Sequence, residues 1–174
     1  MNDNQTRSLR DLLQTQQLAA LGTLHKGRPF VSMVPFAALP DGTGLVIHVS
    51  QLATHTRDMI SEPNVSLMVM AQPKPDVLPQ AVPRVTIQGQ AMQCAEPSQI
   101  HAAAKAAYLA RFPQSEEMFG FADFSLFVVR PTSARFVGGF AQAASPTPAQ
   151  LVGILCGGRS ASDAIQSGIA PNVA

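Results

Sequence analysis

Short runs of β-forming residues, separated by strong turn signals, are the feature that most limits what this chain of 174 residues can fold into. Residues 20–25, 30–38 and 44–49 are three such runs, and the connections between them contain HKGRP and LPDGTG. Glycine reaches positive φ at low cost and proline fixes φ, so both connections favour tight turns. The pattern predicts three strands in an antiparallel meander.

Helical periodicity interrupts the strands at intervals. Helices are predicted over residues 5–20, 50–62 and 97–111. The second of these has Ser50 at the N-cap position and is ended by Pro63. The third is expected to be a surface helix.

Further strands are predicted over residues 64–71, 84–94 and, as two segments, 124–140. The first is almost continuously apolar and is expected to be buried on both faces. Pro131 is expected at a bend or an edge, because proline donates no ladder hydrogen bond. Residues 72–83 contain four prolines and are predicted to form a surface loop.

Six or seven strands with short helices between them lack the alternating rhythm of a parallel α/β sheet. A barrel or a sandwich remains, and closure into a barrel removes exposed strand edges, so the sequence favours a mainly β barrel with flanking helices. Residues 1–140 are expected to form this domain. Residues 141–174 are rich in Gly, Ser and Pro and predict a weakly ordered tail or a short helix near residues 149–155.

Composition narrows the partners and the location. Hydrophobic residues make up 46% of the chain, charged residues 13%, and the formal net charge is +1, so nucleic acid is not an expected partner. Low charge on so apolar a chain suggests that a second copy covers exposed apolar surface. The opening MNDNQTRSLRDLLQTQQ lacks the basic and apolar regions of a signal peptide, and no apolar run approaches the ~20 residues of a membrane span. A cytoplasmic homodimer is expected.

Several kinds of site are not supported by any motif. Cys94 and Cys156 lie far apart without CxxC spacing, and the four histidines form no metal-binding pattern. Neither GxGxxG nor a Walker sequence occurs, and no GxSxG elbow is present. The sequence therefore does not support a metal site, a dinucleotide-binding site or a serine hydrolase.

The segment VIHVSQLATHTRD brings hydroxyls and a cation to the start of a helix. Helix N–H groups and the helix dipole favour an anion there, and arginine can grip phosphate oxygens with two donors. A phosphate site is therefore one interpretation, with Ser50, Thr54, His55, Thr56 and Arg57. In the other, which the residues alone favour, Ser50 only caps the helix and Arg57 pairs with Asp58 or Asp11 on the surface.

Polar residues alternate along the strand that begins RVTIQG. Arg84, Thr86 and Gln88 share one face, where guanidinium and amide donors could meet the carbonyl edge of a planar heterocycle. A strand with one solvated face explains the same alternation and is the commoner case.

Four segments in this order carry a family resemblance: LGTLHKGRPFVSMVPFA, GLVIHVSQLATHTRDMISEPNVSLMV, RVTIQGQA and FSLFVVRPTSARFVGGF. The chain resembles the pyridoxamine 5′-phosphate oxidase-like, FMN-binding split-barrel superfamily, and more closely its haem-utilisation branch, over roughly residues 5–140. The resemblance implies a split β-barrel of six to seven antiparallel strands, of Greek-key type, that forms a homodimer with FMN at the interface.

The resemblance also implies roles for particular residues. The strand with Ser32, Met33, Val34 and Pro35 would flank the flavin ring, largely through backbone atoms. The ribityl phosphate would be held by His48, Val49, Ser50, Thr54, His55, Thr56 and Arg57. Arg84 and Gln88 would approach the ring from the next strand.

Two departures from the vitamin-synthesising oxidase change the expected activity. Its Arg-Lys phosphate pair appears here as Thr54-His55, and its Arg-rich substrate-binding end is missing. The sequence therefore predicts an FMN-dependent oxidoreductase of unknown substrate, not a true pyridoxamine phosphate oxidase. A flavin- or haem-binding module without turnover is the alternative, and an interaction domain that has lost its cofactor is a third.

Overall fold

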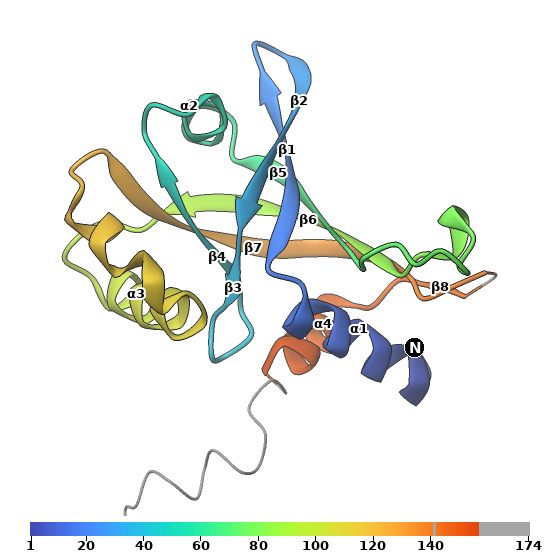
Figure 1. The fold of residues 1–174 in the computed structure, drawn as a ribbon. Coiled ribbons are helices and arrows are strands. Elements are labelled where there is room, and N and C mark those ends of the chain that lie inside the picture. Colours follow the sequence, from blue (N-terminus) through green and yellow to red (C-terminus); the bar gives the residue numbers. More distant parts are fainter. Residues whose placement is uncertain (141, 157–174) are drawn as a thin grey trace, which may run out of the picture.

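The computed structural model describes residues 1–140 and 142–156, which fold around one antiparallel sheet that curls into a half-barrel (Figure 1). Its strands run in the order β2-β1-β5-β6-β7-β4-β3, and β8 pairs with β7. The strands are β1 (Leu18–His25), β2 (Arg28–Pro35), β3 (Ala37–Ala38), β4 (Leu45–Ser50), β5 (Asn64–Met70), β6 (Arg84–Gln93), β7 (Phe124–Val137) and β8 (Ala143–Ala144). The predicted mainly β fold is confirmed.

Helices cover the ends and one side of this sheet. They are α1 (Asp3–Thr15), α2 (Thr54–Ser61), α3 (Gln99–Arg111) and α4 (Pro148–Cys156), with 3₁₀ segments η1 (Pro79–Ala81) and η2 (Pro113–Gly120). In Figure 1, α1 and α4 lie together at one end of the half-barrel, α2 lies near the tip of the β1-β2 hairpin, and α3 lies beside β4.

The predicted meander is wrong in one respect, because the run over residues 30–38 is not one strand. It divides at the fully buried Phe36, and its two parts, β2 and β3, lie at opposite edges of the sheet order. The Phe36 amide leaves the ladder and donates to the carbonyl of Gln17. Since a single residue connects the two edges, the sheet must curl until they approach each other, which is the geometry of a split barrel.

Both predicted turns are present. Lys26 and Gly27 have φ of 52° and 75°, the pair of positive values that a two-residue hairpin turn needs. Gly42 in the second turn has φ of 70°, and a Cβ built there would lie 2.4 Å from the carbonyl oxygen of Val152. This turn therefore packs directly against α4, and only glycine fits.

The two final β segments predicted within residues 124–140 are one continuous strand, β7. Pro131 lies within it, beyond the point where Leu45 of β4 pairs with Val129, so no ladder bond to β4 is lost. On the β6 side the register shifts between Gln88 and Gly89. This bulge absorbs the proline and lets the long strand continue.

The core fills the inside of the curled sheet and continues under α1 and α4. Leu9, Leu12 and Leu13 of α1 belong to the same buried cluster as Leu151, Ile154 and Leu155 of α4. The short helix predicted near residues 149–155 is confirmed as α4. Residue 141 and residues 157–174 lie outside the described part of the chain.

One predicted strand and one predicted helix need correction. Strand β5 is buried on one face only: Val65, Leu67 and Val69 face the core, whereas Met68 and Met70 are exposed. Helix α2 begins at Thr54 after the N-cap Ala53, so Ser50 is not its cap. Residues 51–53 form a turn instead, which separates the hydroxyl of Ser50 from the helix start.

Helix α2 is held on the barrel by a buried carboxylate. Asp58 accepts hydrogen bonds from the hydroxyl of Thr23 at 2.9 Å and contacts Nδ1 of His25 at 2.8 Å, so both carboxylate oxygens face β1. This pairing satisfies a charge that would otherwise be costly to bury.

Candidate cofactor site

The outer face of the sheet presents two rows of side chains that cross five strands. Cross-strand partners share a face, and the register aligns Met33, Ala20, Met68, Thr86 and Arg135 in one row. The neighbouring row runs through Val31, Gly22, Ser66, Gln88 and Ser133. Each row is apolar or small on β2 and β1 and polar on β6 and β7.

The apolar end of these rows is exposed. Val31 is 67% exposed, Met33 60% and Met68 38%. Between these side chains, Ala20 and Gly22 on β1 project little or nothing from the sheet. We call the part of the outer face that carries these two rows the outer shelf. Its apolar end is low and is bordered by taller side chains.

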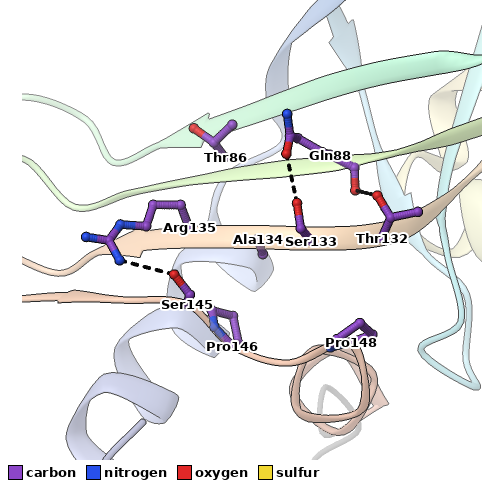
Figure 2. A pocket seen from close by; sticks show the side chains of 9 residues that line it. All are labelled: Thr86, Gln88, Thr132, Ser133, Ala134, Arg135, Ser145, Pro146 and Pro148. Carbon is purple, nitrogen blue, oxygen red and sulfur yellow. Dashed lines mark hydrogen bonds between the residues drawn. The ribbon is translucent and has the colours of Figure 1, made fainter.

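A cavity of about 310 Å³ lies at the polar end of the rows. Figure 2 shows its lining, with Thr86 and Gln88 on β6, residues 132–135 on β7, Ser145 and Pro146 before α4, and Pro148 at the start of α4. Among the described residues that line it, Arg135 alone carries a charge. The cavity therefore has hydroxyl and amide groups around a single cation.

Hydrogen bonds fix the polar groups of this cavity. The hydroxyl of Ser133 donates to the side-chain oxygen of Gln88 at 2.8 Å, and Arg135 Nη1 donates to the hydroxyl of Ser145 at 3.1 Å (Figure 2). The hydroxyl of Thr132 donates to the Gln88 carbonyl. Since a guanidinium has five N–H donors, Arg135 keeps donors for an anionic group.

The junction between β4 and α2 is arranged differently from the predicted phosphate pocket. The Ser50 hydroxyl donates to the carboxylate of Asp123 at 2.7 Å, and the amides of Gln51 and Leu52 are used by the Asp123 carbonyl and the Ser50 hydroxyl. Thr56 donates to the Ser50 carbonyl. These groups mainly stabilise the turn over residues 51–53.

The first turn of α2 still has backbone N–H groups that could bind an anion. Its N-cap Ala53 offers no side-chain acceptor, so no capping side chain uses the N–H groups that begin with Thr54. Arg57 is exposed, and the described chain records no ion pair for it, so the predicted pairing with Asp58 or Asp11 is not formed.

Two of the sequence-predicted site residues carry buried polar atoms without a partner. The Ser32 hydroxyl on β2 and Nε2 of His55 on α2 are both enclosed and form no hydrogen bond within the described chain. Burial lowers the pKa of His55, so its imidazole is neutral near pH 7. Unused buried polar groups are uncommon in native proteins and are consistent with a missing ligand or water.

The structure does not bring all the predicted residues together. Val34 and Val49 face the barrel core, and the ring of His48 faces α3, away from β2. Arg84 donates to the carbonyls of Gln80 and Val82 and so holds the loop before β6. Of the predicted set, Met33 and Gln88 lie on the outer shelf or its cavity.

The contribution of β7 to the cavity is not evident from the sequence pattern alone. Thr132, Ser133 and Arg135 line the cavity, yet the RPTSARF segment was given no site role. The signal was present, because Ser133 and Arg135 alternate with the buried Ala134 and Phe136. Only the register of β6 against β7 shows that they face the same side as Gln88.

The curled sheet, the connection through Phe36 between its two edge strands, and the flanking helices define a split β-barrel. A model of the pyridoxamine 5′-phosphate oxidase family matches residues 6–138, and the chain belongs to that family. The expected membership of its haem-utilisation branch is confirmed by the relatives that follow.

Relatives in this branch are similar in both sequence and structure. Over 126 residues the chain is 35% identical to the chloroplastic haem oxygenase HOZ of Arabidopsis thaliana, a match that covers 72% of this chain and 37% of that protein. The chain thus spans little more than a third of that relative.

Two solved structures extend the comparison. A haem-binding protein from Mycobacterium smegmatis superposes with a TM-score of 0.77 at 28% identity, covering 88% of this chain and 62% of that one. HutZ, the haem storage protein from Vibrio cholerae, gives 0.66 at 25% identity, covering 72% and 88%.

Residues 1–140 and 142–156 contain no helix that is both long and apolar enough for a membrane span. The same residues contain no group of three or more His, Cys, Asp or Glu side chains placed to hold a metal ion.

Proposed function

We propose that this protein binds haem on the outer shelf, with the macrocycle over the apolar side chains of β2, β1 and β5 and the propionates directed toward Arg135. The observation that carries the proposal is the row Met33–Ala20–Met68–Thr86–Arg135, which passes from apolar to cationic across one face of the sheet. Haem has the matching asymmetry, because its ring is flat and apolar and both carboxylates lie along one edge.

The dimensions of the outer shelf agree with such a ligand. Neighbouring strands lie about 4.8 Å apart, so the apolar part from β2 to β5 is about 10 Å wide and Arg135 on β7 lies about 10 Å further on. Exposed methionines adapt to flat apolar ligands because the side chain is flexible and polarizable. The haem-binding names of the relatives support the same class of ligand.

A second copy of the chain is the proposed cover for the shelf. Strand β2 is the edge of the sheet order and carries the exposed Val31 and Met33, a combination that soluble proteins usually cover. A homodimer formed through this face would enclose the haem between two shelves, and it would cover the exposed Met68 and Met70 of β5.

Titration of the purified protein with hemin tests the proposal. Wild-type protein should give a saturable Soret band, and Met68→Lys should weaken binding because a charged side chain replaces apolar contact on the shelf. Ile60→Lys places the same charge on an exposed residue of α2 and is the matched control. Equal affinity of the two variants would contradict the shelf assignment.

The Arg135→Gln variant tests the polar end of the outer shelf separately from its apolar end. Loss of one charge-assisted hydrogen bond should weaken hemin binding by about tenfold or more, whereas Arg7→Gln on the exposed surface of α1 should leave it unchanged. A non-saturable, weak Soret change in wild-type protein would reject haem as the ligand.

FMN is the second candidate, and the uncapped start of α2 beside the exposed Arg57 is the observation that favours it. In this case the flavin would supply electron-transfer chemistry, as in an oxidoreductase of unknown substrate, and Thr54, His55 and Arg57 would hold its phosphate. Arg57→Ala should then cost about 1.5–3 kcal/mol of FMN binding free energy, measured by flavin fluorescence, with Arg7→Ala as the control. Unchanged FMN affinity in Arg57→Ala would reject this phosphate site.

A further inference from the structure

A second cavity, of about 350 Å³, lies where α3 and η2 meet the ends of β4, β6 and β7. It surrounds Phe124 and Ser125 at the start of β7, whereas the cavity of the outer shelf surrounds residues 132–135 further along the same strand. The two cavities share no lining residue, so whatever fills this one is separate from the haem proposed above.

The side chain of His48 faces this cavity without a polar partner. His48 is only 6% exposed as a residue, but its ring nitrogens are not among the fully enclosed polar atoms of the described chain, so what remains exposed of the ring includes polar atoms. The ring is held by stacking, parallel to Phe119 with 4.0 Å between centroids and edge-on to Tyr108 at 5.6 Å. The imidazole is thus fixed in position at the edge of the cavity, where its polar atoms are available to a ligand.

Basic side chains lie around the same space. Lys105 Nζ lies 5.0 Å from the centroid of Phe119, and His101 also lines the cavity. Glu96 is the one carboxylate among the described lining residues; it lies 3.7 Å from Nε2 of His101, and its side chain is 74% exposed, so solvent screens its charge. The enclosed part of the cavity therefore favours a negative ligand.

The remaining lining is aromatic and amide. Phe119, Phe121 and Phe124 provide flat apolar surface, and Gln51 and Gln93 both donate to the hydroxyl of Ser125, which fixes the polar floor. The volume is near the lower end for small-molecule sites. A ligand for this space has a flat apolar body and one anionic group.

We propose that this cavity is a second ligand site, for a small aromatic or similarly flat carboxylate. The carboxylate accepts hydrogen bonds from Lys105 and from the imidazole N–H of His48, and the ring of the ligand lies against the phenylalanines. The low pKa of His48, about 4, agrees with this arrangement, because burial and then the nearby charges of His101 and Lys105 disfavour its protonation. A bound carboxylate would offset those charges.

Benzoate is a suitable probe. Binding to the full chain would be measured by calorimetry and by the NMR signals of the His48 ring nitrogens, with neutral benzamide as the matched ligand. Benzoate should bind, shift the His48 signals and raise the pKa of His48, whereas benzamide should bind more weakly. No shift of the His48 signals, or equal binding of both compounds, would overturn the proposal.

Lysine variants locate the anion. Lys105→Gln should weaken benzoate binding by about tenfold or more, and Lys74→Gln in the exposed loop should not change it. Hemin titration of Lys105→Gln should match wild type, since Lys105 does not line the outer shelf. Equal benzoate affinity of Lys105→Gln and Lys74→Gln would also overturn the proposal.

Discussion

The direction of one side chain decides which groups it meets, and His48 is the example. The family resemblance implies a phosphate-binding role for it. In the structure its neighbours on β4, Ile47 and Val49, face the barrel core, so strand alternation directs the imidazole outward, under α3. There it stacks between aromatic rings and stays neutral.

The stability of the protein should depend on pH through His48. Its folded pKa of about 4 lies below the ordinary 6.5, so between these values the unfolded chain binds a proton at this site that the folded chain does not. The free energy of unfolding should therefore be highest above pH 6.5 and fall as pH drops toward 4, with His48 contributing about 3 kcal/mol of that loss.

Urea unfolding at several pH values measures this contribution. The carboxylates of the chain also titrate in this range, so the comparison is between wild type and His48→Gln, which differ at the one titrating group. The difference in unfolding free energy between them should change steadily from pH 6.5 to pH 4. Parallel pH profiles would contradict the assignment of a depressed pKa to this residue.

Among the elements, α4 follows the segment expected to be the domain, yet it belongs to the core. Leu151 is 1% exposed and packs in the same cluster as the leucines of α1. Leu151→Ala should therefore destabilise the whole fold by about 2–5 kcal/mol, as a cavity in a packed core does.

Val152→Ala is the matched control, because Val152 is only partly buried on the same helix. Thermal and urea unfolding of the two variants would distinguish a structural α4 from a loosely attached one. A Leu151→Ala protein as stable as Val152→Ala would show that α4 adds nothing to the core.

Local patterns predicted most of the elements correctly. The turns at Gly27 and Gly42 and the helix over residues 99–111 each depend on signals within a few residues. The division at Phe36 could not be predicted in this way, because it depends on curling of the sheet and on the long-range bond to Gln17. Likewise, the apolar run of β5 does not reveal whether its outer face is covered by a helix of the same chain.

The candidate site was predicted less completely than the fold. Alternation along its own strand places Gln88 on the polar face of β6, which needs only local information, and Gln88 lines the cavity. Arg135 lies 47 positions after Gln88 in the sequence. It pairs with Thr86 because β6 and β7 are in a particular register, and that register includes a bulge. A site built across strands requires the pairing of the strands, which composition and periodicity do not specify.

At the scale of the whole molecule, the curled sheet separates two kinds of surface. The inner surface is filled by the core, and helices cover the ends and the β4 side of the outer surface. What remains is the outer shelf, apolar on β2 and β5 and cationic on β7. Its exposure in one chain is the physical reason to expect both a flat ligand and a second copy there.

Methionine oxidation tests the central claim most directly, because the chain carries exposed methionines both on and away from the shelf. Met33 and Met68 lie on it, and Met92, 47% exposed near the far end of β6, does not. Gallium protoporphyrin replaces haem as a redox-inert ligand, and peptide mass spectrometry follows the rate at which each methionine becomes sulfoxide. Bound porphyrin, verified by absorption, should slow oxidation of Met33 and Met68 and leave Met92 unchanged. Equal oxidation rates at Met33 and Met68 with and without bound porphyrin would contradict the account.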